Sequence, residues 1–244
     1  MLNRIRIVLV EPSHPGNIGG AARAMKTMGL SDLVVVAPRR FPDPQADWRA
    51  AGALDVLDAA RVVEDVPSAV GDCHMLVGTS TRNRKIPWPI GDAKEIAAKL
   101  QQALVRDDTH KVAVLFGRED SGLTNEELRL CHAHLQIPAN PTYSSLNLAM
   151  AVQVVCYELF QIQAEAPPAL GWDRRMATQA EVNGMLEHLD QVLTSSGFIQ
   201  ADNPGQTMTR LRRMFARIEP DETEIQILRG VIKHLDEQAG GQPE

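Results

Sequence analysis

Short, wholly apolar segments alternate with helical patterns along the first two thirds of the chain, and this alternation restricts the fold more than any other feature. β-Branched and apolar runs predict strands at residues 5–10, 33–36, 61–63, 75–77, 112–116 and 135–137. Helical spacing predicts helices at residues 18–28, 47–57, 92–104 and 125–130. Strands that are apolar on both faces and separated by helices are typical of a parallel sheet covered on both sides. We therefore predict an α/β fold.

The last third of the chain has a different pattern. A long helical pattern over residues 144–163 is followed by a stretch with the paired prolines Pro167 and Pro168, which is typical of a linker. Beyond it the pattern is helical at residues 178–196, 204–218 and 221–237. We predict an α/β domain over residues 1–163, a linker over 164–177 and a small helical extension over 178–239.

Composition and termini exclude several classes of protein. The 244 residues contain no apolar run long enough to span a membrane, and the N-terminus has no signal-peptide pattern, so we expect a cytoplasmic protein without a membrane partner. Three widely spaced cysteines do not favour a disulfide framework. The segment from Cys131 to His134 suggests a metal site, but no second ligand pair has a familiar spacing, and we predict no bound metal.

Charge by itself gives an ambiguous indication of the partner. The net charge of −6 does not favour nucleic acid, because phosphate binding uses Lys and Arg. Basic residues nevertheless cluster in three places, which are Arg39-Arg40, Arg82-Asn83-Arg84-Lys85, and Arg210, Arg212, Arg213 and Arg217. Each cluster is compatible either with a solvated surface or with RNA contact.

Three loops carry the residues of chemical interest, and each follows a predicted strand, where α/β sheets bind their ligands. The first contains Asn17, Gly19 and Gly20, with Arg23 six residues after Asn17. Its glycines allow close approach of a partner, and Asn17 is suited to cap the following helix. The glycine spacing matches neither the phosphate loop nor the dinucleotide fingerprint. Taken by itself, this loop is better explained as a tight turn before a capped helix.

The other two loops are richer in small and polar residues. The second, residues 115–123, places Arg118, Glu119, Asp120 and Ser121 between two glycines, although an ordinary turn capped by Thr124 or Asn125 would also have this composition. The third, residues 137–150, joins the last predicted strand to the long helix. Ser144 or Ser145 is suited to cap that helix, and Asn147 falls in its first turn.

Taken together and in order, these loops resemble the three motifs of SPOUT methyltransferases, in particular the TrmH-like branch that methylates ribose 2′-hydroxyls. The matching residues are Asn17, Gly19 and Arg23, then Phe116, Gly117, Glu119, Gly122 and Leu123, then Ser144, Ser145, Leu146 and Asn147. The resemblance covers roughly residues 2–163. The stretches at 24–30, 79–82 and 85–89, with the helical extension, are most similar to the bacterial TrmJ-type subgroup, which methylates the ribose of nucleotide 32 in the tRNA anticodon loop.

The resemblance implies a SPOUT-type parallel sheet with a C-terminal trefoil knot that holds the methyl donor, S-adenosylmethionine, and a homodimer that completes the site. The implied donor-binding residues are Thr79, Ser80, Thr81, Gly117, Ile137, Ser144, Ser145 and Leu146. Backbone groups of the glycine and serine loops would bind the polar edges of the donor, and the apolar side chains would form the walls.

The resemblance also implies that Arg23 acts beside the ribose, oriented by Asn17, Glu119, Ser145 and Asn147. A guanidinium rarely releases its proton, so an equally sound hypothesis is that Arg23 binds a phosphate and stabilises the developing alkoxide while water or phosphate takes the proton. We expect Arg23, Arg82, Arg84 and Lys85 to contact tRNA.

Three other functions compete with tRNA methylation: the same reaction on ribosomal RNA, a non-catalytic RNA-binding protein of this fold, and a nucleotide-binding regulator. Arg23 and Asn17 argue against the second, and the segment from Ser145 to Asn147 has no use in the third.

Overall fold

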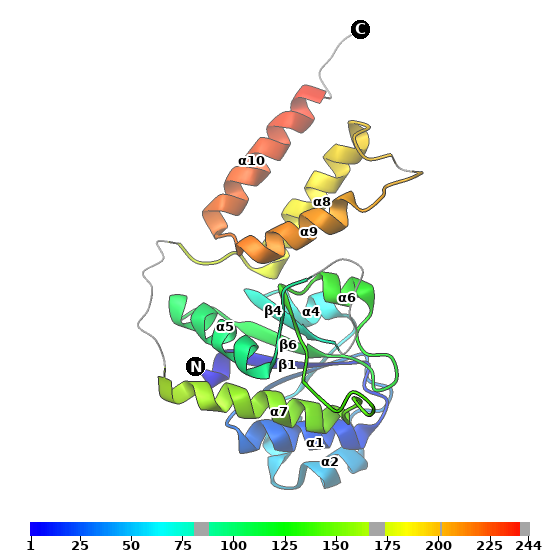
Figure 1. Ribbon diagram of the computed structural model, residues 1–244, viewed down its shortest axis with the longest axis vertical. Helices are drawn as coiled ribbons and strands as arrows, with labels where there is room; N and C mark the ends of the chain where they lie inside the picture. Colours follow the sequence, from blue (N-terminus) through cyan, green and yellow to red (C-terminus); the bar gives the residue numbers. More distant parts are fainter. Residues whose placement is uncertain (81–87, 166–173, 201, 240–244) are drawn as a thin grey trace.

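The protein has a three-layer α/β body with a helical extension at one end, seen in a computed structural model that describes residues 1–80, 88–165, 174–200 and 202–239 (Figure 1). Within the described residues, the body contains one sheet of seven strands, and every pair of neighbouring strands is parallel. This confirms the predicted α/β class. No helix among the described residues is long and apolar enough to cross a membrane.

The strands lie in the order β3-β2-β1-β6-β4-β7-β5. In chain order they are β1 (Ile5–Val10), β2 (Asp32–Val36), β3 (Arg61–Val63), β4 (Met75–Thr79), β5 (Ile90–Gly91), β6 (Val112–Phe116) and β7 (Ala133–Leu135). Alternate residues of β1 enter different cores, with Ile7 and Leu9 on one face and Val8 and Val10 on the other. This two-sided burial is why the strands are apolar throughout.

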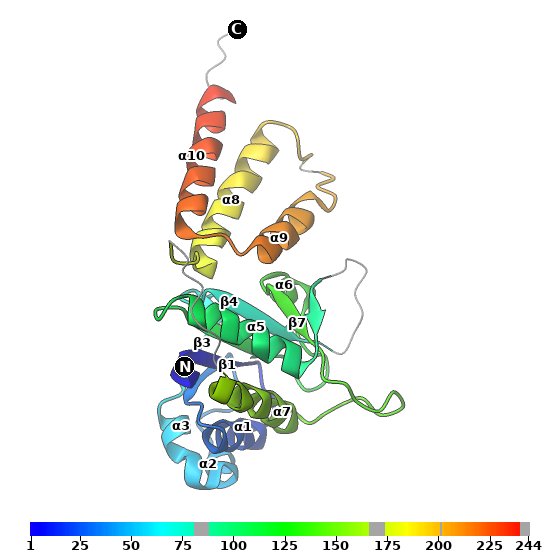
Figure 2. The same ribbon diagram turned by 60° about the vertical axis from the view of Figure 1, so that its left-hand side comes forward.

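Helices cover both faces of the sheet (Figure 2). One core is formed with α1 (Pro15–Thr27), α2 (Pro44–Ala50), α3 (Leu54–Asp58), α5 (Ala93–Arg106) and α7 (Leu148–Gln161), and the other with α4 (Val66–Val70) and α6 (Asn125–Arg129). Helices α1 and α7 lie side by side in both views. A Cβ added at Gly20 of α1 would stand 2.8 Å from the Ala149 Cβ of α7, so the absence of a side chain there allows the close approach.

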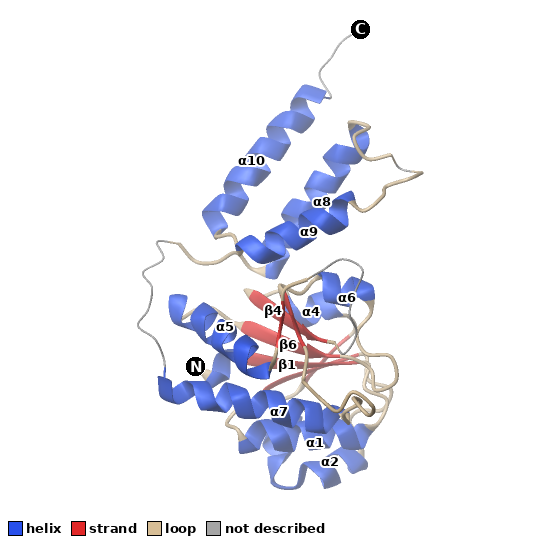
Figure 3. Cartoon of the chain, in the orientation of Figure 1, coloured by secondary structure: helices blue, strands red, loops and turns tan. Residues whose placement is uncertain are grey.

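Among its described residues, the extension has helices and no strand (Figure 3). The helices are α8 (Gln179–Ser195), α9 (Thr207–Ile218) and α10 (Glu222–Ala239). It has its own apolar core, which includes Met185, Phe215 and Ile232. Two backbone N–H groups attach it to the body: that of Gln179 donates to the Cys73 carbonyl at 2.9 Å, and that of Met176 to His110 Nε2 at 3.0 Å. The predicted division into two domains and a linker stays a prediction.

Several predicted boundaries are wrong, for identifiable reasons. The last strand is Ala133–Leu135 rather than 135–137, because a histidine bonded to a carbonyl can be buried in a strand: His134 Nε2 lies 3.1 Å from the Leu128 oxygen. The helix predicted at 47–57 is interrupted at Ala51, which has a φ of 50°. The two-residue strand Ile90–Gly91 was too short to give a periodic signal.

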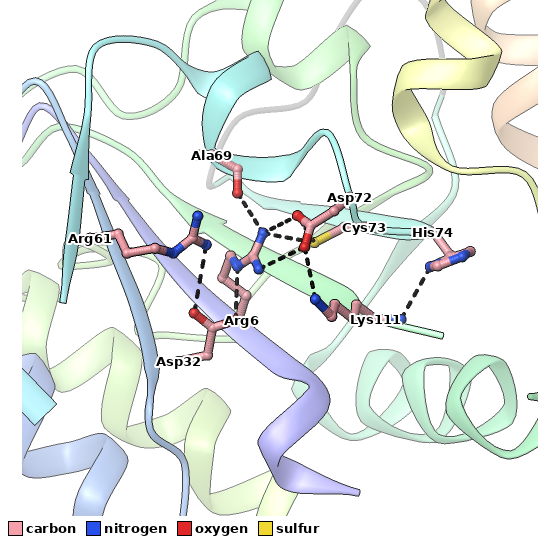
Figure 4. Close-up of polar contacts among 8 residues, drawn as sticks. All are labelled: Arg6, Asp32, Arg61, Ala69, Asp72, Cys73, His74 and Lys111. Atoms are coloured by element: carbon pink, nitrogen blue, oxygen red, sulfur yellow. Dashed lines mark hydrogen bonds and ion pairs between the residues drawn. The ribbon is translucent and has the colours of Figure 1, made fainter. Parts of the chain in front are cut away.

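A buried arginine joins the amino ends of the central strands (Figure 4). Arg6 of β1, 4% exposed, donates to Asp32 Oδ2 at 2.9 Å, to Asp72 Oδ1 at 2.5 Å and to the Ala69 carbonyl at 2.8 Å. Lys111 Nζ also donates to Asp72, at 3.0 Å. These bonds satisfy a charge that would otherwise be costly to bury. They lie at the edge of the sheet opposite the three loops.

Candidate active site

A pocket of about 280 Å³ opens at the carboxyl ends of β4, β6 and β7, bordered by the second and third loops. Its lining includes seven of the eight residues expected to bind the methyl donor, which are Thr79, Ser80, Gly117, Ile137, Ser144, Ser145 and Leu146. The eighth, Thr81, lies outside the described residues. Parallel strands bring these distant segments to one edge of the sheet.

The second loop is a tight turn that only glycine permits at two positions. The Gly122 N–H donates to the Arg118 carbonyl at 2.9 Å, and the Arg118 N–H donates to the Gly122 carbonyl at 3.3 Å. Gly122 has a φ of +73°, in the left-handed region. A Cβ at Gly117 would stand 2.1 Å from the Gly122 carbonyl carbon. The turn therefore folds back on itself and leaves its outer surface to the pocket.

Arg118, which the sequence analysis did not single out as a site residue, holds this turn in place. Its Nε donates to Glu11 Oε2 at 3.1 Å, and its Nη2 donates to Glu127 Oε1 at 3.0 Å. The hydrogen bonds to Glu127 and Glu11, of which the one to Glu127 has the larger effect, raise the pKa of Arg118 above its ordinary value. The charge is therefore permanent, and the side chain ties the second loop to the end of β1 and to α6.

A chain of hydrogen bonds joins all three loops. Glu119 Oε1 of the second loop accepts from Asn17 Nδ2 at 2.9 Å, and Asn17 Oδ1 accepts from Asn147 Nδ2 at 2.9 Å. Glu119 Oε2 also accepts from the backbone N–H and the hydroxyl of Ser13, both at 3.0 Å. The structure thus brings together three of the predicted site residues, and it adds Ser13, which has no distinctive sequence signal.

The carboxyl of Glu119 stays ionised in this arrangement. Partial burial raises its pKa, but the hydrogen bonds from Ser13 and Asn17 outweigh that effect and hold the pKa below the ordinary value of 4.5. An ionised carboxylate whose oxygens are already engaged is suited to orient Asn17 rather than to act as a base at neutral pH.

Two predicted helix caps are wrong. Asn147, and not Ser144 or Ser145, caps α7: its Oδ1 accepts from the Ala149 N–H at 2.9 Å. Asn17 does not cap α1, which begins at Pro15 and is capped by His14 Nδ1 at 3.1 Å from the Gly16 N–H. Both serines are thereby left in an extended segment beside the pocket, and the Asn17 side chain is free for the chain of hydrogen bonds. Of the two caps considered for an ordinary turn after the second loop, Thr124 and Asn125, it is Thr124 that caps α6.

Arg23 lies on α1, less than two turns after Asn17, and is exposed. Among the described residues, its guanidinium forms no hydrogen bond or ion pair. It therefore remains available to an external anion. Arg82, Arg84 and Lys85 lie outside the described residues.

The segment from Cys131 to His134 is structural. His132 Nδ1 accepts from the Leu76 N–H at 3.0 Å, Cys131 is fully buried, and the Cys131 carbonyl accepts from Trp88 Nε1 at 2.6 Å. Burial lowers the pKa of His132 to about 4, so its imidazole is neutral at pH 7.

Known proteins match this chain along its whole length. The sequence model of the SpoU rRNA methylase family matches residues 4–157. The chain belongs to the SpoU rRNA methylase family. Residues 180–244 match the C-terminal domain of tRNA methyltransferase TrmJ. These matches confirm the resemblance that the three loops and the extension predicted.

Relatives and solved structures agree with this assignment. The tRNA (cytidine/uridine-2′-O-)-methyltransferase TrmJ of Klebsiella pneumoniae is 46% identical over 99% of this chain and 100% of that protein. The crystal structure of TrmJ from Z. mobilis has a TM-score of 0.82 and 35% identity, covering 95% of this chain and 98% of that one. The SpoU methyltransferase AviRb from Streptomyces viridochromogenes, solved in complex with the cofactor AdoMet, has a TM-score of 0.53 and 25% identity over 67% of this chain and 62% of that one.

Proposed function

We propose that this protein methylates a ribose 2′-hydroxyl of tRNA with S-adenosylmethionine, at the cytidine or uridine of position 32 in the anticodon loop. The observation that carries the proposal is the convergence of the three loops: the pocket expected to hold the donor lies beside the chain formed by Glu119, Asn17 and Asn147. Full-length similarity to a TrmJ enzyme supports the tRNA substrate. Such a substrate is met in the cytoplasm, which is the location we propose.

The pocket is chemically suited to the donor. Ile137 and Leu146 provide apolar walls, while Thr79 and Ser80 add polar groups and the turn at Gly117 exposes backbone. When bound, S-adenosylmethionine supplies a methyl group on a sulfonium, which is already a good leaving group. Catalysis by the protein then consists mainly of alignment of the ribose oxygen and help with its proton.

Arg23 is the residue that we propose beside the ribose. An exposed guanidinium without a partner among the described residues is suited to bind the phosphate next to the target nucleotide and to stabilise negative charge on the 2′-oxygen. A guanidinium rarely releases its proton and so is a poor base, and the proton passes to water or phosphate. Asn17, held by Glu119 and Asn147, keeps this end of α1 in position, and Ser145 borders the donor.

Turnover of purified variants with tRNA tests the role of Arg23. We expect Arg23→Ala to lower kcat by about 10²-fold or more, the usual effect of losing one stabilising donor, and Arg23→Lys to restore only part of the rate because lysine lacks the planar fork. Lys26→Ala removes the same charge from α1 at a residue that pairs with Asp55, and it should leave kcat nearly unchanged. Near-wild-type rates in both Arg23 variants would refute the assignment.

Two further features complete the proposal. The SPOUT relationship supports a trefoil knot in the C-terminal part of the body, and the position of β7 between β4 and the earlier strand β5 is compatible with a threaded chain. A homodimer is supported by α7, where Met150, Val154, Tyr157 and Phe160 follow at helical spacing and are each 37–59% exposed. We also propose that Arg82, Arg84 and Lys85, which follow Ser80 in the sequence, contact tRNA phosphates.

The same reaction on ribosomal RNA is the second candidate, because the matching family is described by that substrate. Mapping 2′-O-methyl sites in both RNAs from cells that lack the protein separates the two. Loss of methylation at position 32 of tRNA is expected, and loss only in ribosomal RNA would favour the second candidate.

A further inference from the structure

A second hollow, larger than the donor pocket, lies where the extension meets the body. It is a groove of about 500 Å³ between α4, the end of α6, and helices α8 and α9. Its polar lining includes Arg129 of the body, Gln179 and Asn183 of α8, and Arg212 of α9. None of these residues belongs to the proposed reaction, so the groove needs its own explanation.

One buried polar atom in the groove has no partner among the described residues. Gln179 is 6% exposed, its Nε2 donates to Asn183 Oδ1 at 3.1 Å, and its Oε1 accepts no hydrogen bond. A buried acceptor without a donor costs free energy, which a ligand with a hydroxyl or N–H would recover. The void of about 10 Å³ beneath the groove, bordered by His132 and Gln179, has room for at most one water molecule. The groove itself is therefore the space large enough for a ligand.

The charged groups of the groove are also unpaired. Within the part of the chain that the structure describes, Arg129 and Arg212 form no ion pair, nor do Glu126 and Glu187, which also border the groove. Two arginines and two glutamates give the lining no net charge. Recognition would therefore depend on the positions of the two guanidiniums and not on the total charge of the groove. A guanidinium without a partner is suited to bind phosphate oxygens.

The groove lies close to the donor pocket along the chain. Leu123 lines the pocket, and Glu126, three positions later, lines the groove. Even a fully extended chain from Leu123 to Arg129 would span at most about 20 Å. A single polynucleotide whose target ribose lies beside the donor pocket could therefore also reach the groove.

We propose that this groove binds a second stretch of the sugar–phosphate backbone of the RNA substrate. Arg129 and Arg212 bind phosphate oxygens. The Gln179 side chain, whose Oε1 is buried in the free protein, turns toward the groove and accepts a hydrogen bond from a ribose 2′-hydroxyl, a donor that RNA has and DNA lacks. Because one wall is body and the other is extension, bound RNA holds the two together. This inference rests on the proposed RNA substrate.

Salt-dependent tRNA binding tests the arginines. For each phosphate that a variant no longer binds, the slope of log affinity against log salt should fall in magnitude by about 0.7–0.9. We therefore expect Arg129→Ala and Arg212→Ala each to flatten the slope by this amount and to weaken binding roughly tenfold, with donor binding and Tm unchanged. Arg210→Ala is the matched control, because it removes the same charge from an exposed position of α9 outside the groove lining.

The outcomes separate this inference from the proposed function. If the wild-type protein binds tRNA and the Arg129→Ala and Arg212→Ala variants bind it equally well, only the proposal about the groove is overturned. An equal effect of Arg210→Ala would also overturn it, because the effect would then be one of general charge. A wild-type protein that binds S-adenosylmethionine but no tRNA would overturn both the groove and the proposed substrate.

Two further variants test the remaining contacts. Glu187→Gln removes a carboxylate from the groove without changing its shape, and it should strengthen tRNA binding; weaker binding would contradict the proposal. Gln179→Met removes the unpartnered acceptor at similar volume. It should reduce the preference for tRNA over DNA of the same sequence, and an unchanged preference would refute the 2′-hydroxyl contact.

Discussion

Gly117 is the position at which the geometry makes the sharpest prediction about the donor pocket. In Gly117→Ala, the new Cβ would stand 2.1 Å from the Gly122 carbonyl carbon and 2.2 Å from the Leu123 nitrogen. Ordinary van der Waals contact begins at 3.4 Å. Because both atoms belong to the backbone, no side-chain rotation relieves the overlap, and the two limbs of the turn must separate by more than an ångström.

The consequences of that separation can be estimated from the contacts of the turn. The two backbone hydrogen bonds between Arg118 and Gly122 would break, at about 0.5–1.5 kcal/mol each. Because the turn borders the pocket, its displacement also misplaces the donor, and an error of about 1 Å can lower the rate about 10²-fold. We expect the affinity for S-adenosylmethionine to fall at least tenfold and kcat about 10²-fold, with a decrease of about 1–3 kcal/mol in the free energy of unfolding.

Isothermal titration with S-adenosylmethionine, single-turnover methylation of tRNA and urea unfolding measure these three quantities. Gly230→Ala is the control, because a Cβ there meets no atom within 4 Å and alanine is the better helix former. It should raise the free energy of unfolding by about 0.5–1 kcal/mol and leave donor binding unchanged. Donor affinity within twofold of wild type in Gly117→Ala, with Tm unchanged, would refute the reasoning.

Three other predictions concern stability and assembly. Arg6→Ala leaves two aspartates without their buried partner and should lower the free energy of unfolding in urea by about 3–5 kcal/mol. Arg61→Ala removes only a half-exposed contact of 3.8 Å and should lower it by less than about 1 kcal/mol. Similar losses in the two variants would contradict the role of the buried network. Burial lowers the pKa of His132 to about 4. As pH falls from 6.5 to 4 the unfolded chain therefore binds a proton that the folded protein does not, and the free energy of unfolding should fall by up to about 3 kcal/mol. Urea titrations at pH 7 and pH 5 should show about 2 kcal/mol of this loss. The loss should be smaller in His132→Asn, whose Oδ1 can accept the same backbone bond, and an identical loss in both proteins would exclude His132 as a source. Val154→Glu, which places a charge on the exposed apolar face of α7, should convert a dimer to a monomer in analytical ultracentrifugation, and a variant that remains dimeric would place the interface elsewhere.

The strands, and the edge of the sheet at which the pocket opens, could be predicted from local sequence. A run such as residues 5–10 is apolar at nearly every position because both of its faces are buried, and that property is written in consecutive residues. Ser80, Gly117 and Ser144 follow strands of a parallel sheet, so one topological rule brings them to the same edge. The family motifs added the donor and the residues expected to bind it, together with the role proposed for Arg23.

Other features depend on contacts between residues that are far apart in sequence. Asn147 caps α7 in place of the neighbouring serines while its amide reaches Asn17 across the site, and neither residue alone indicates the other. Arg118 becomes the support of the second loop only because Glu11, at the end of β1, lies beside it. The partner of such a side chain is set by the three-dimensional path of the chain.

What the sequence by itself determined is the set of local preferences: which segments form strands, which loops contain small and polar residues, and which arginine stands less than two helix turns beyond Asn17. Only the tertiary structure decided which groups meet, as in the chain from Glu119 through Asn17 to Asn147 and in the groove between Arg129 and Arg212. The physical reason is that burial periodicity and backbone preference act between neighbours along the chain. Hydrogen bonds and cavities, in contrast, require several distant segments to be in place at once.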